Sequence, residues 1–433
     1  MTDEKSAPVL TRREGLALGA ASLVVNFAPA AFAAHQETPM STDIRPFRVS
    51  FPDADLADLK RRVAATRWPD KEQVADTTQG VQLVTMQQLV KHWADHDWRK
   101  VEARLNSYPN FLTEIDGLDI HFIHVKSKHA DALPMIVTHG WPGSVVEQLK
   151  IIEPLTDPTA HGGTAADAFH LVIPSLPGYG FSGKPTEPGW IPSRIAKAWA
   201  ALMQRLGYTK YVAQGGDWGN AVTENMAVQQ PPGLIGIHTN MPATVPAEIN
   251  ASLAAGKPPA GLGADELKAW NQLFYFNNNG LGYAIEMNNR PQTLYGIADS
   301  PVGLAAWMID HDDASEKMIA RSLAGGSEGL SPDDVLDNVT LYWLTNTAIS
   351  SARLYWDNAK HPTGGFFDPR GIKIPVAVTA FPDEIYTAPK SWAEKAYPRL
   401  IHYGKAAKGG HFAAWEQPAI FVDEMRASFR SLR

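Results

Sequence analysis

The sequence contains no cysteine, so disulfide bonds contribute nothing to its stability. It also contains no glycine motif of the Walker or dinucleotide-binding type. The net charge of -7 is not the basic excess that binding to nucleic-acid phosphates requires. No internal repeat and no low-complexity tract is visible. These absences argue against a nucleic-acid partner and against a nucleotide cofactor.

The composition that remains is typical of a large globular enzyme. The chain has 433 residues and 44% hydrophobic residues, enough for one large or two medium domains. His121, His124 and His129 lie close together in the sequence, but the first two fall on opposite faces of an expected strand and have no acidic or thiol partner nearby. Histidines in such a setting are more often core or surface residues than ligands. We therefore expect no metal and no cofactor.

The segment GGDWG at residues 215–219 is the most informative part of the chain. Its form, glycine-x-nucleophile-x-glycine, is typical of the sharp strand-to-helix turn that presents the nucleophile of α/β-hydrolases. The central residue is Asp217, where a serine is usual. A carboxylate is already ionised at neutral pH and attacks a saturated carbon, which forms an ester on the enzyme. The expected substrate therefore has a displaceable bond at carbon, as an epoxide or a haloalkane does.

The residues on either side favour such a turn. Residues 208–214 (YTKYVAQ) are expected to form a strand, and residues 220–228 are expected to start a helix. Gly215 and Gly219 would let the strand and the helix approach each other without Cβ clashes. The alternative is an ordinary glycine-rich turn in which Asp217 caps a helix.

A hydrolytic triad needs an acid and a histidine after the nucleophile. The expected histidine is His411, which follows two glycines and the last expected strand, residues 400–403. The acid should come just after the strand expected at residues 374–380, where Asp383 and Glu384 are adjacent. Neighbouring residues of an extended chain point to opposite sides, so only one of the two can reach His411.

An oxyanion hole should be formed by two backbone N–H groups. A core strand expected at residues 134–138 leads into the loop HGWPGS at residues 139–144. The expected donors are the N–H groups of Trp141 in this loop and of Trp218 directly after the nucleophile. They would stabilise the charge on the carboxyl oxygen of Asp217 during hydrolysis of the ester.

Four segments together resemble the microsomal-type epoxide hydrolases, a group that includes the juvenile-hormone epoxide hydrolases of insects. They are HGWPGS at 139–144, GYGFS at 178–182, GGDWG at 215–219 and GGHFAAWEQP at 409–418. The resemblance extends over nearly the whole chain after residue 34. It includes the N-terminal region of that family at residues 44–110, with TRWP at 66–69 as its clearest marker. The family's acid is a glutamate shortly after a Phe-Pro pair, which implies Glu384 rather than Asp383.

The resemblance also implies two lid tyrosines that donate hydrogen bonds to the epoxide oxygen as the ring opens. By local pattern these are Tyr283 and Tyr355, with Tyr295 as the substitute for Tyr283. Spacing alone would not select them, because the chain has 12 tyrosines and most should pack in the core or at its edge.

The expected architecture is an α/β-hydrolase fold with a mostly parallel sheet, a helical lid insertion and an N-terminal meander. The catalytic domain is expected at residues 111–241 and 369–433, and it should begin as a hairpin that turns at Asp116-Gly117. The pattern between residues 242 and 368 is helical and aromatic, and this segment should be the lid.

Residues 1–34 are expected to be a signal peptide of the twin-arginine type. Arg12 and Arg13 precede a short apolar stretch, and Ala31-Phe32-Ala33 offers a cleavage site. We therefore expect a periplasmic bacterial enzyme that is exported folded and has no stable membrane anchor. The alternative is an uncleaved N-terminus that anchors the chain in a membrane.

The sequence thus predicts a cofactor-independent epoxide hydrolase that converts hydrophobic epoxides to vicinal diols through an aspartyl ester. Its expected partners are a small-molecule epoxide and water, and a homodimer is left open. One alternative is a haloalkane dehalogenase, which would use the same aspartate without needing the tyrosines. The other is a non-catalytic binding protein of the same fold.

Overall fold

The computed structural model describes residues 43–362 and 371–433. The segment expected to be a signal peptide, residues 1–34, lies outside the described residues. Among the helices of these two ranges, none is long and apolar enough to cross a membrane.

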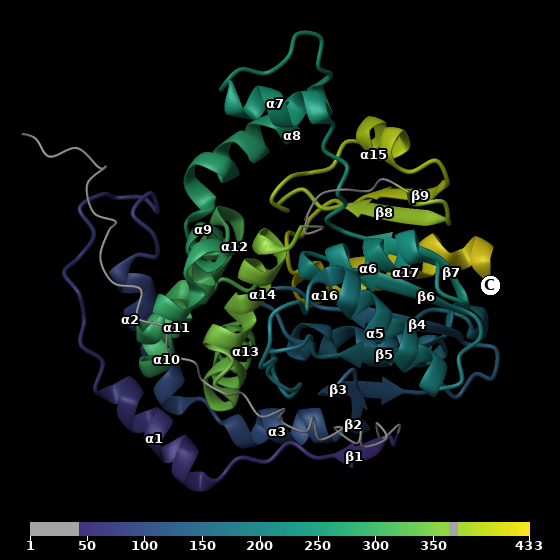
Figure 1. The fold of residues 1–433 in the computed structure, drawn as a ribbon. Coiled ribbons are helices and arrows are strands. Elements are labelled where there is room, and N and C mark those ends of the chain that lie inside the picture. The colour runs from purple at the N-terminus through teal and green to yellow at the C-terminus, as the bar shows by residue number, and fades with distance from the viewer. Residues whose placement is uncertain (1–42, 363–370) are drawn as a thin grey trace, which may run out of the picture. The chain divides into compact units, whose positions relative to one another are not determined.

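A nine-stranded sheet forms the centre of the described part of the chain, with the order β1-β2-β3-β5-β4-β6-β7-β8-β9 (Figure 1). Strands β5, β4, β6, β7, β8 and β9 run parallel to one another, whereas β1, β2 and β3 pair in antiparallel fashion at one edge. The bounds are β1 (Arg45–Phe47), β2 (Asn110–Ile115), β3 (Leu118–Val125), β4 (Leu133–Thr138), β5 (Phe169–Pro174), β6 (Tyr211–Gly215), β7 (Leu234–Thr239), β8 (Val376–Ala380) and β9 (Leu400–Lys405). The mostly parallel sheet predicted from the sequence is confirmed.

The expected hairpin is formed by β2 and β3. Its turn residues Asp116 and Gly117 both have positive φ angles, 55° and 77°, which the short hairpin turn requires. The strand before Asp217 is shorter than expected and begins at Tyr211 instead of Tyr208. The reason is local: the preceding helix ends at Arg205 and is terminated by Gly207 at a φ of 80°, and the N–H of Tyr208 donates back to the carbonyl of Met203.

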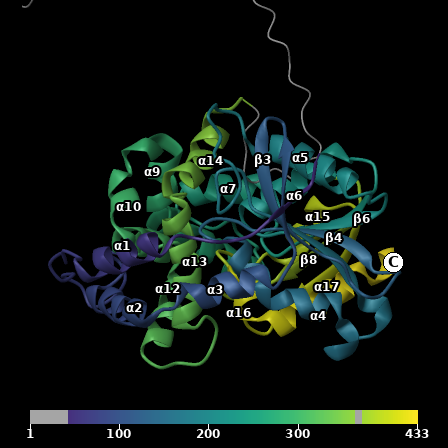
Figure 2. The same cartoon turned by 90° about the horizontal axis from the view of Figure 1, so that it is seen from below.

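Helices cover both faces of the sheet (Figure 2). Helices α5 and α6 pack against each other on one face, and α6 contacts β4, β6 and β7. On the other face, η1 contacts α4, α16 and α17, and α17 packs on β7, β8 and β9. The bounds are η1 (Val145–Ile151), α4 (Ile152–Thr156), η2 (Pro158–Ala160), η3 (Ala165–Asp167), α5 (Pro192–Arg205), α6 (Trp218–Gln229), α15 (Lys390–Ala396), α16 (Ala413–Glu416), α17 (Pro418–Phe429) and η6 (Arg430–Leu432).

The chain between β7 and β8 contains helices and loops but no strand in its described part. This is the segment that the sequence predicts to be the lid, and we refer to it by that name. In Figure 1 most of its helices lie to one side of the sheet. The bounds are α7 (Ala247–Ala254), α8 (Ala264–Tyr275), the π-helical turn η4 (Phe276–Gly280), α9 (Gly282–Asn289), η5 (Pro291–Thr293), α10 (Tyr295–Asp299), α11 (Pro301–Ile309), α12 (Asp313–Leu323), α13 (Pro332–Thr345) and α14 (Ala348–Lys360).

The N-terminal region joins the lid to the edge of the sheet. Its elements are β1 and the helices α1 (Asp53–Ala64), α2 (Leu83–Asp95) and α3 (Trp98–Asn106). Strand β1 pairs with β2, whereas α2 contacts the lid helices α11, α12 and α13. The indole of Trp93 donates a buried hydrogen bond of 3.0 Å to the hydroxyl of Thr340 in α13. This region therefore packs the lid against the rest of the described chain.

Candidate active site

Asp217 lies at the sharp turn between β6 and α6. Its φ of 52° is a conformation that non-glycine residues rarely adopt, and it projects the carboxylate away from the strand. The turn has no room for side chains on either flank, because a Cβ on Gly215 would lie 2.1 Å from the Gly219 carbonyl oxygen. A Cβ on Gly219 would lie 2.0 Å from the carbonyl oxygen of Thr138 in β4. The two glycines thus permit the close approach of strand and helix that this turn needs.

The loop after β4 binds the carboxylate of Asp217. The backbone N–H of Trp141 donates a hydrogen bond of 2.8 Å to Asp217 Oδ1. Gly140 makes this approach possible, since a Cβ at that position would lie 2.4 Å from Cβ of Asp217. Trp218, the second expected donor, is the first residue of α6 and directly follows the carboxylate. One oxygen of the carboxylate is thus held by a backbone donor before any substrate is present.

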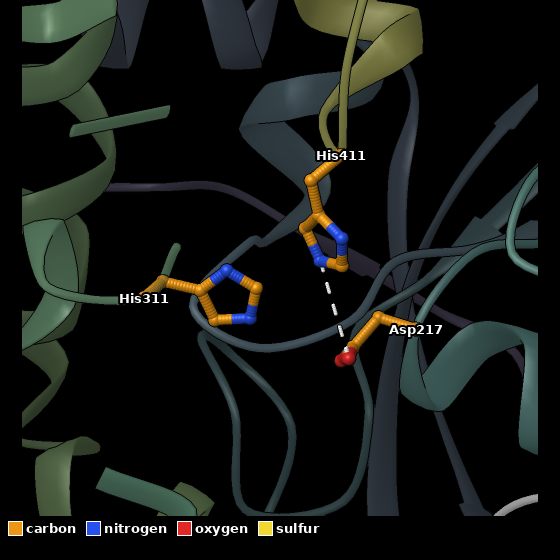
Figure 3. A group of neighbouring side chains, drawn as sticks. All are labelled: Asp217, His311 and His411. Carbon is orange, nitrogen blue, oxygen red and sulfur yellow. Dashed lines mark ion pairs between the residues drawn. The ribbon is translucent and has the colours of Figure 1, made fainter. Parts of the chain in front are cut away.

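His411 and Glu384 form a buried pair beside Asp217. Glu384 Oε1 lies 2.6 Å from His411 Nδ1. On the other side of the ring, His411 Nε2 lies 4.0 Å from Asp217 Oδ2, the ion pair drawn in Figure 3. Asp383, the competing acid, is exposed, and its backbone bridges to Gly410 in the loop that carries the histidine. Of the two adjacent carboxylates, the structure brings Glu384 to the histidine.

The charges around His411 favour its protonated form. Burial alone would lower the pKa of this imidazole, but the negative charges of Glu384, Asp217 and Asp312 outweigh burial and raise the pKa to about 10. The electrostatics of the site thus favour an imidazolium beside Glu384 and Asp217. One of these, Asp217, is the residue that would lose its charge on alkylation.

Tyr283 and Tyr355 reach the same place from lid helices α9 and α14. The ring of Tyr283 stacks on Trp141 at 4.8 Å, and the ring of Tyr355 meets Trp218 edge-on at 4.7 Å. Burial, and after it nearby negative charge that includes Asp217, raises the pKa of both phenols well above the usual value. Both hydroxyls therefore stay protonated and able to donate. Tyr295, the substitute for Tyr283, is 68% exposed and lies apart from this cluster.

A second histidine, which no sequence motif indicated, faces the same carboxylate. His311 follows α11 in the lid, and its ring centroid lies 4.3 Å from that of His411. Figure 3 shows His311 and His411 pointing toward Asp217 from two sides. His311 Nδ1 lies 3.0 Å from Oδ2 of Asp312, whose other oxygen caps helix α12. The only pattern in the sequence at this point is Asp-x-x-Ser, which is typical of a helix N-cap. It does not indicate what His311 faces, because that depends on how the lid packs against the rest of the chain.

A further buried carboxyl group, that of Glu147, also lies near Asp217. Burial raises its pKa to about 8, with the charge of Asp217 adding to that rise and His411 opposing it. Its Oε1 accepts a hydrogen bond of 2.6 Å from Gln148 Nε2. Both side chains line a cavity of about 20 Å³ that also contacts Asp217 and His411, which is room for one water molecule.

Comparison with known proteins agrees with this geometry. The sequence model described as "Epoxide hydrolase N terminus" matches residues 44–148, and the "alpha/beta hydrolase fold" model matches residues 134–274. The chain is 34% identical to epoxide hydrolase 1 of Sus scrofa over 88% of each chain. It is 52% identical to a protein of Stigmatella aurantiaca that is provisionally named an epoxide hydrolase, over 90% of this chain and 86% of the other.

Solved structures agree over almost the full length. The crystal structure of juvenile hormone epoxide hydrolase from the silkworm Bombyx mori superposes with a TM-score of 0.79 at 29% identity, over 92% of this chain and 97% of the other. The Aspergillus niger epoxide hydrolase superposes with a TM-score of 0.76 at 31% identity, over 91% and 98%. The chain therefore belongs to the microsomal-type epoxide hydrolases of the α/β-hydrolase superfamily.

Proposed function

We propose that this enzyme hydrolyses hydrophobic epoxides to vicinal diols through a covalent ester on Asp217. The observation that carries the proposal is the position of the Asp217 carboxylate. One oxygen accepts from the Trp141 N–H, and the other lies 4.0 Å from the imidazole of a buried histidine–glutamate pair. This arrangement provides a nucleophile, an oxyanion donor and a base around a single carbon atom.

In the first half-reaction the Asp217 carboxylate attacks an epoxide carbon. A bond forms between the carboxylate oxygen and that carbon, and the ring C–O bond breaks toward the ring oxygen. Tyr283 and Tyr355 donate hydrogen bonds to this oxygen as negative charge develops on it. The alkoxide takes a phenolic proton to become a hydroxyl group, and the proton that His411 then releases restores the phenol. The aromatic rings of Trp141 and Trp218 beside the two tyrosines favour an apolar substrate.

In the second half-reaction His411 becomes the base. Alkylation removes the charge of Asp217, one of the charges that raise the pKa of His411, so the imidazole releases its proton more readily. His411 then takes a proton from water, and the hydroxide attacks the carbonyl carbon of the ester. The Trp141 N–H, with that of Trp218, stabilises the oxyanion. Breakage of the ester C–O bond, with transfer of the new carboxyl proton to the departing oxygen, releases the diol and restores the Asp217 carboxylate, while His411 keeps the proton taken from water. Glu384 holds the imidazole through Nδ1.

The test is the intact mass of the His411→Gln protein after exposure to styrene oxide. The ester should form and stall, so the mass should rise by one substrate on a peptide that contains Asp217. The His411→Gln, Asp217→Ala double variant is the matched control and should gain nothing. Adduct formation with a haloalkane but with no epoxide would favour dehalogenation, and no adduct with either would favour a binding protein.

We further propose that residues 1–34 direct export of the folded enzyme to the bacterial periplasm. The support is the Arg12-Arg13 pair before a short apolar stretch and a cleavage site at Ala31-Phe32-Ala33. The Arg12→Lys, Arg13→Lys variant should remain uncleaved in the cytoplasmic fraction, whereas the unchanged chain should appear shortened in the periplasmic fraction. Equal distribution of the two proteins would contradict the proposal.

A further inference from the structure

The active site contains two histidines held in the same way. His411 binds Glu384 through Nδ1 at 2.6 Å, and His311 binds Asp312 through Nδ1 at 3.0 Å. In each ring the remaining nitrogen, Nε2, is left to face Asp217. Nε2 of His311 is buried and has no hydrogen-bond partner among the described residues. No step of the proposed hydrolysis uses this nitrogen.

The three side chains are placed as the ligands of one metal ion. One ligand atom from each of Asp217, His311 and His411 lies within 4.8 Å of the others, and all three residues are buried (Figure 3). A tetrahedral zinc ion has bonds of about 2.0–2.2 Å, which set its ligand atoms about 3.4 Å apart. Side-chain shifts of about 1 Å would bring the ligand atoms from their spacing in the structure to the spacing that a zinc ion requires.

The carboxylates behind the two histidines strengthen this assignment. Histidines that bind a metal almost always donate their other ring N–H to a carboxylate, a backbone carbonyl or water, which fixes the ring and its tautomer. Glu384 and Asp312 have this position relative to Nδ1 of His411 and of His311. The ligand atoms and the carboxylates that orient them are therefore both present.

A path for a cation also leads to the site. A cavity of about 180 Å³ has exposed residues such as Tyr275, Asn279 and Asp383 on its wall and extends inward to buried His311. Six carboxyl groups line it, from Asp310, Asp312, Asp313, Glu316, Asp383 and Glu384, and among its described lining residues none is lysine or arginine. Such a surface attracts cations and repels anions.

We propose that Asp217, His311 and His411 form a binding site for a divalent transition-metal ion, and that the bound ion inhibits the enzyme. Two imidazole nitrogens and one carboxylate oxygen suit Zn²⁺, Co²⁺ or Cu²⁺, whereas Mg²⁺ and Ca²⁺ prefer oxygen ligands alone. Because a histidine binds a metal as the neutral imidazole, the ion would displace the proton from Nε2 of His411. The ion would occupy both the nucleophile and the base. It would therefore block both half-reactions, and a chelator would restore them.

The test measures binding separately from activity. The full-length chain is titrated with ZnCl₂ by calorimetry and with CoCl₂ by visible absorption, with MgCl₂ as the control ion. We expect one Zn²⁺ per chain, a cobalt spectrum typical of low-coordinate nitrogen and oxygen ligation, and no heat with Mg²⁺. Zinc should also stop styrene oxide turnover, and EDTA should restore it. The turnover measurement rests on the proposed function, whereas the two titrations do not.

Variants assign the ligands. His311→Gln should weaken Zn²⁺ binding by at least about a hundredfold. Asp312→Asn should weaken it by about 10- to 100-fold, since it removes the charge that orients His311 and keeps a side-chain oxygen that can cap α12. His402→Gln is the matched control, because His402 also pairs with a carboxylate, Glu424, at 2.8 Å but lies outside the site. Zn²⁺ binding by this variant should be unchanged.

If His311→Gln does not fold, Asp217→Ala tests the site independently. This variant should also lose Zn²⁺ binding. Failure of the unchanged chain to bind Zn²⁺ with one-to-one stoichiometry would overturn the proposal. Binding that survives both His311→Gln and Asp217→Ala would overturn it equally, because the ion would then be held elsewhere.

Discussion

The two histidine–carboxylate pairs come from different parts of the molecule. The sheet pair, His411 with Glu384, stands on loops that follow β9 and β8, and its members are 27 residues apart in the sequence. The lid pair, His311 with Asp312, consists of adjacent residues between α11 and α12. Both pairs face Asp217, but only the sheet pair forms an ion pair with it.

This difference indicates that the sheet side and the lid have different roles in the reaction. In the proposed mechanism the sheet side provides the nucleophile, the oxyanion donor and the base, all fixed by strand ends and a constrained turn. The lid provides Tyr283, Tyr355 and His311, which approach the same carboxylate from the opposite side. We infer that the sheet side governs hydrolysis of the ester, whereas the lid governs ring opening and access of ions. Single substitutions on each side test that separation.

The largest effect is expected from Asp217→Ala, which removes the group that both sides share. Without the nucleophile no ester can form, and turnover of styrene oxide should fall by about 10⁴-fold or more. The measurement is diol production under substrate saturation, with circular dichroism to verify folding. Substantial residual turnover would mean that water attacks the epoxide directly and that the ester is not on the pathway.

Replacement of each histidine separates the two pairs. His411→Gln should reduce turnover by about 10³- to 10⁴-fold while the ester accumulates, because the base is lost and the nucleophile is kept. His311→Gln should cause a much smaller loss and no accumulation of ester. Stopped reactions analysed by intact mass give both quantities. Ester accumulation in the His311→Gln protein would assign the lid histidine to hydrolysis and remove the distinction.

Loss of one lid tyrosine should slow ring opening alone. Tyr355→Phe and Tyr283→Phe should each reduce turnover by about a hundredfold, since each removes one donor to the developing alkoxide. Single-turnover kinetics should show slower ester formation with unchanged ester breakdown. Tyr295→Phe is the control and should behave as the unchanged enzyme, because Tyr295 is exposed. Slower breakdown in the Tyr355→Phe protein would contradict the assigned step.

The carboxylate of the sheet pair should matter less than its histidine. Glu384→Gln should reduce turnover by about 10- to 100-fold, because the imidazole remains but loses the charge that orients it and raises its pKa. The pH–rate profile should shift to lower pH with it. Asp383→Asn, a change in the neighbouring exposed carboxylate, should have no such effect. Equal losses from both variants would show that the choice between the two acids is wrong.

The sheet side was predictable from sequence because its signals are local. The glycines around Asp217, the glycines before His411 and the apolar strands each leave a pattern in adjacent residues. The side chains from the lid were not predictable in this way, because no local pattern indicates which face of a helix packs toward Asp217. Tyr283 and Tyr355 were selected only through resemblance to a family. His311 left no comparable signal, since its importance arises from packing between segments about a hundred residues apart.

The smallest expected effect is on stability and concerns the sheet pair alone. Folding raises the pKa of His411 from about 6.5 to about 10, so the folded chain binds this proton more tightly than the unfolded chain does. The resulting stabilisation is complete below about pH 6.5 and is lost as the pH rises through 10. The free energy of unfolding of the unchanged protein should therefore approach that of His411→Gln between pH 6 and pH 10, as measured by urea denaturation.

Glu147, whose pKa of about 8 also makes stability fall as the pH rises, is present in both proteins. Its contribution therefore cancels to first order in the difference between their free energies of unfolding. A difference that stays constant or grows with pH would mean that His411 is neutral in the resting enzyme, and the proton release that follows alkylation of Asp217 would then be unnecessary.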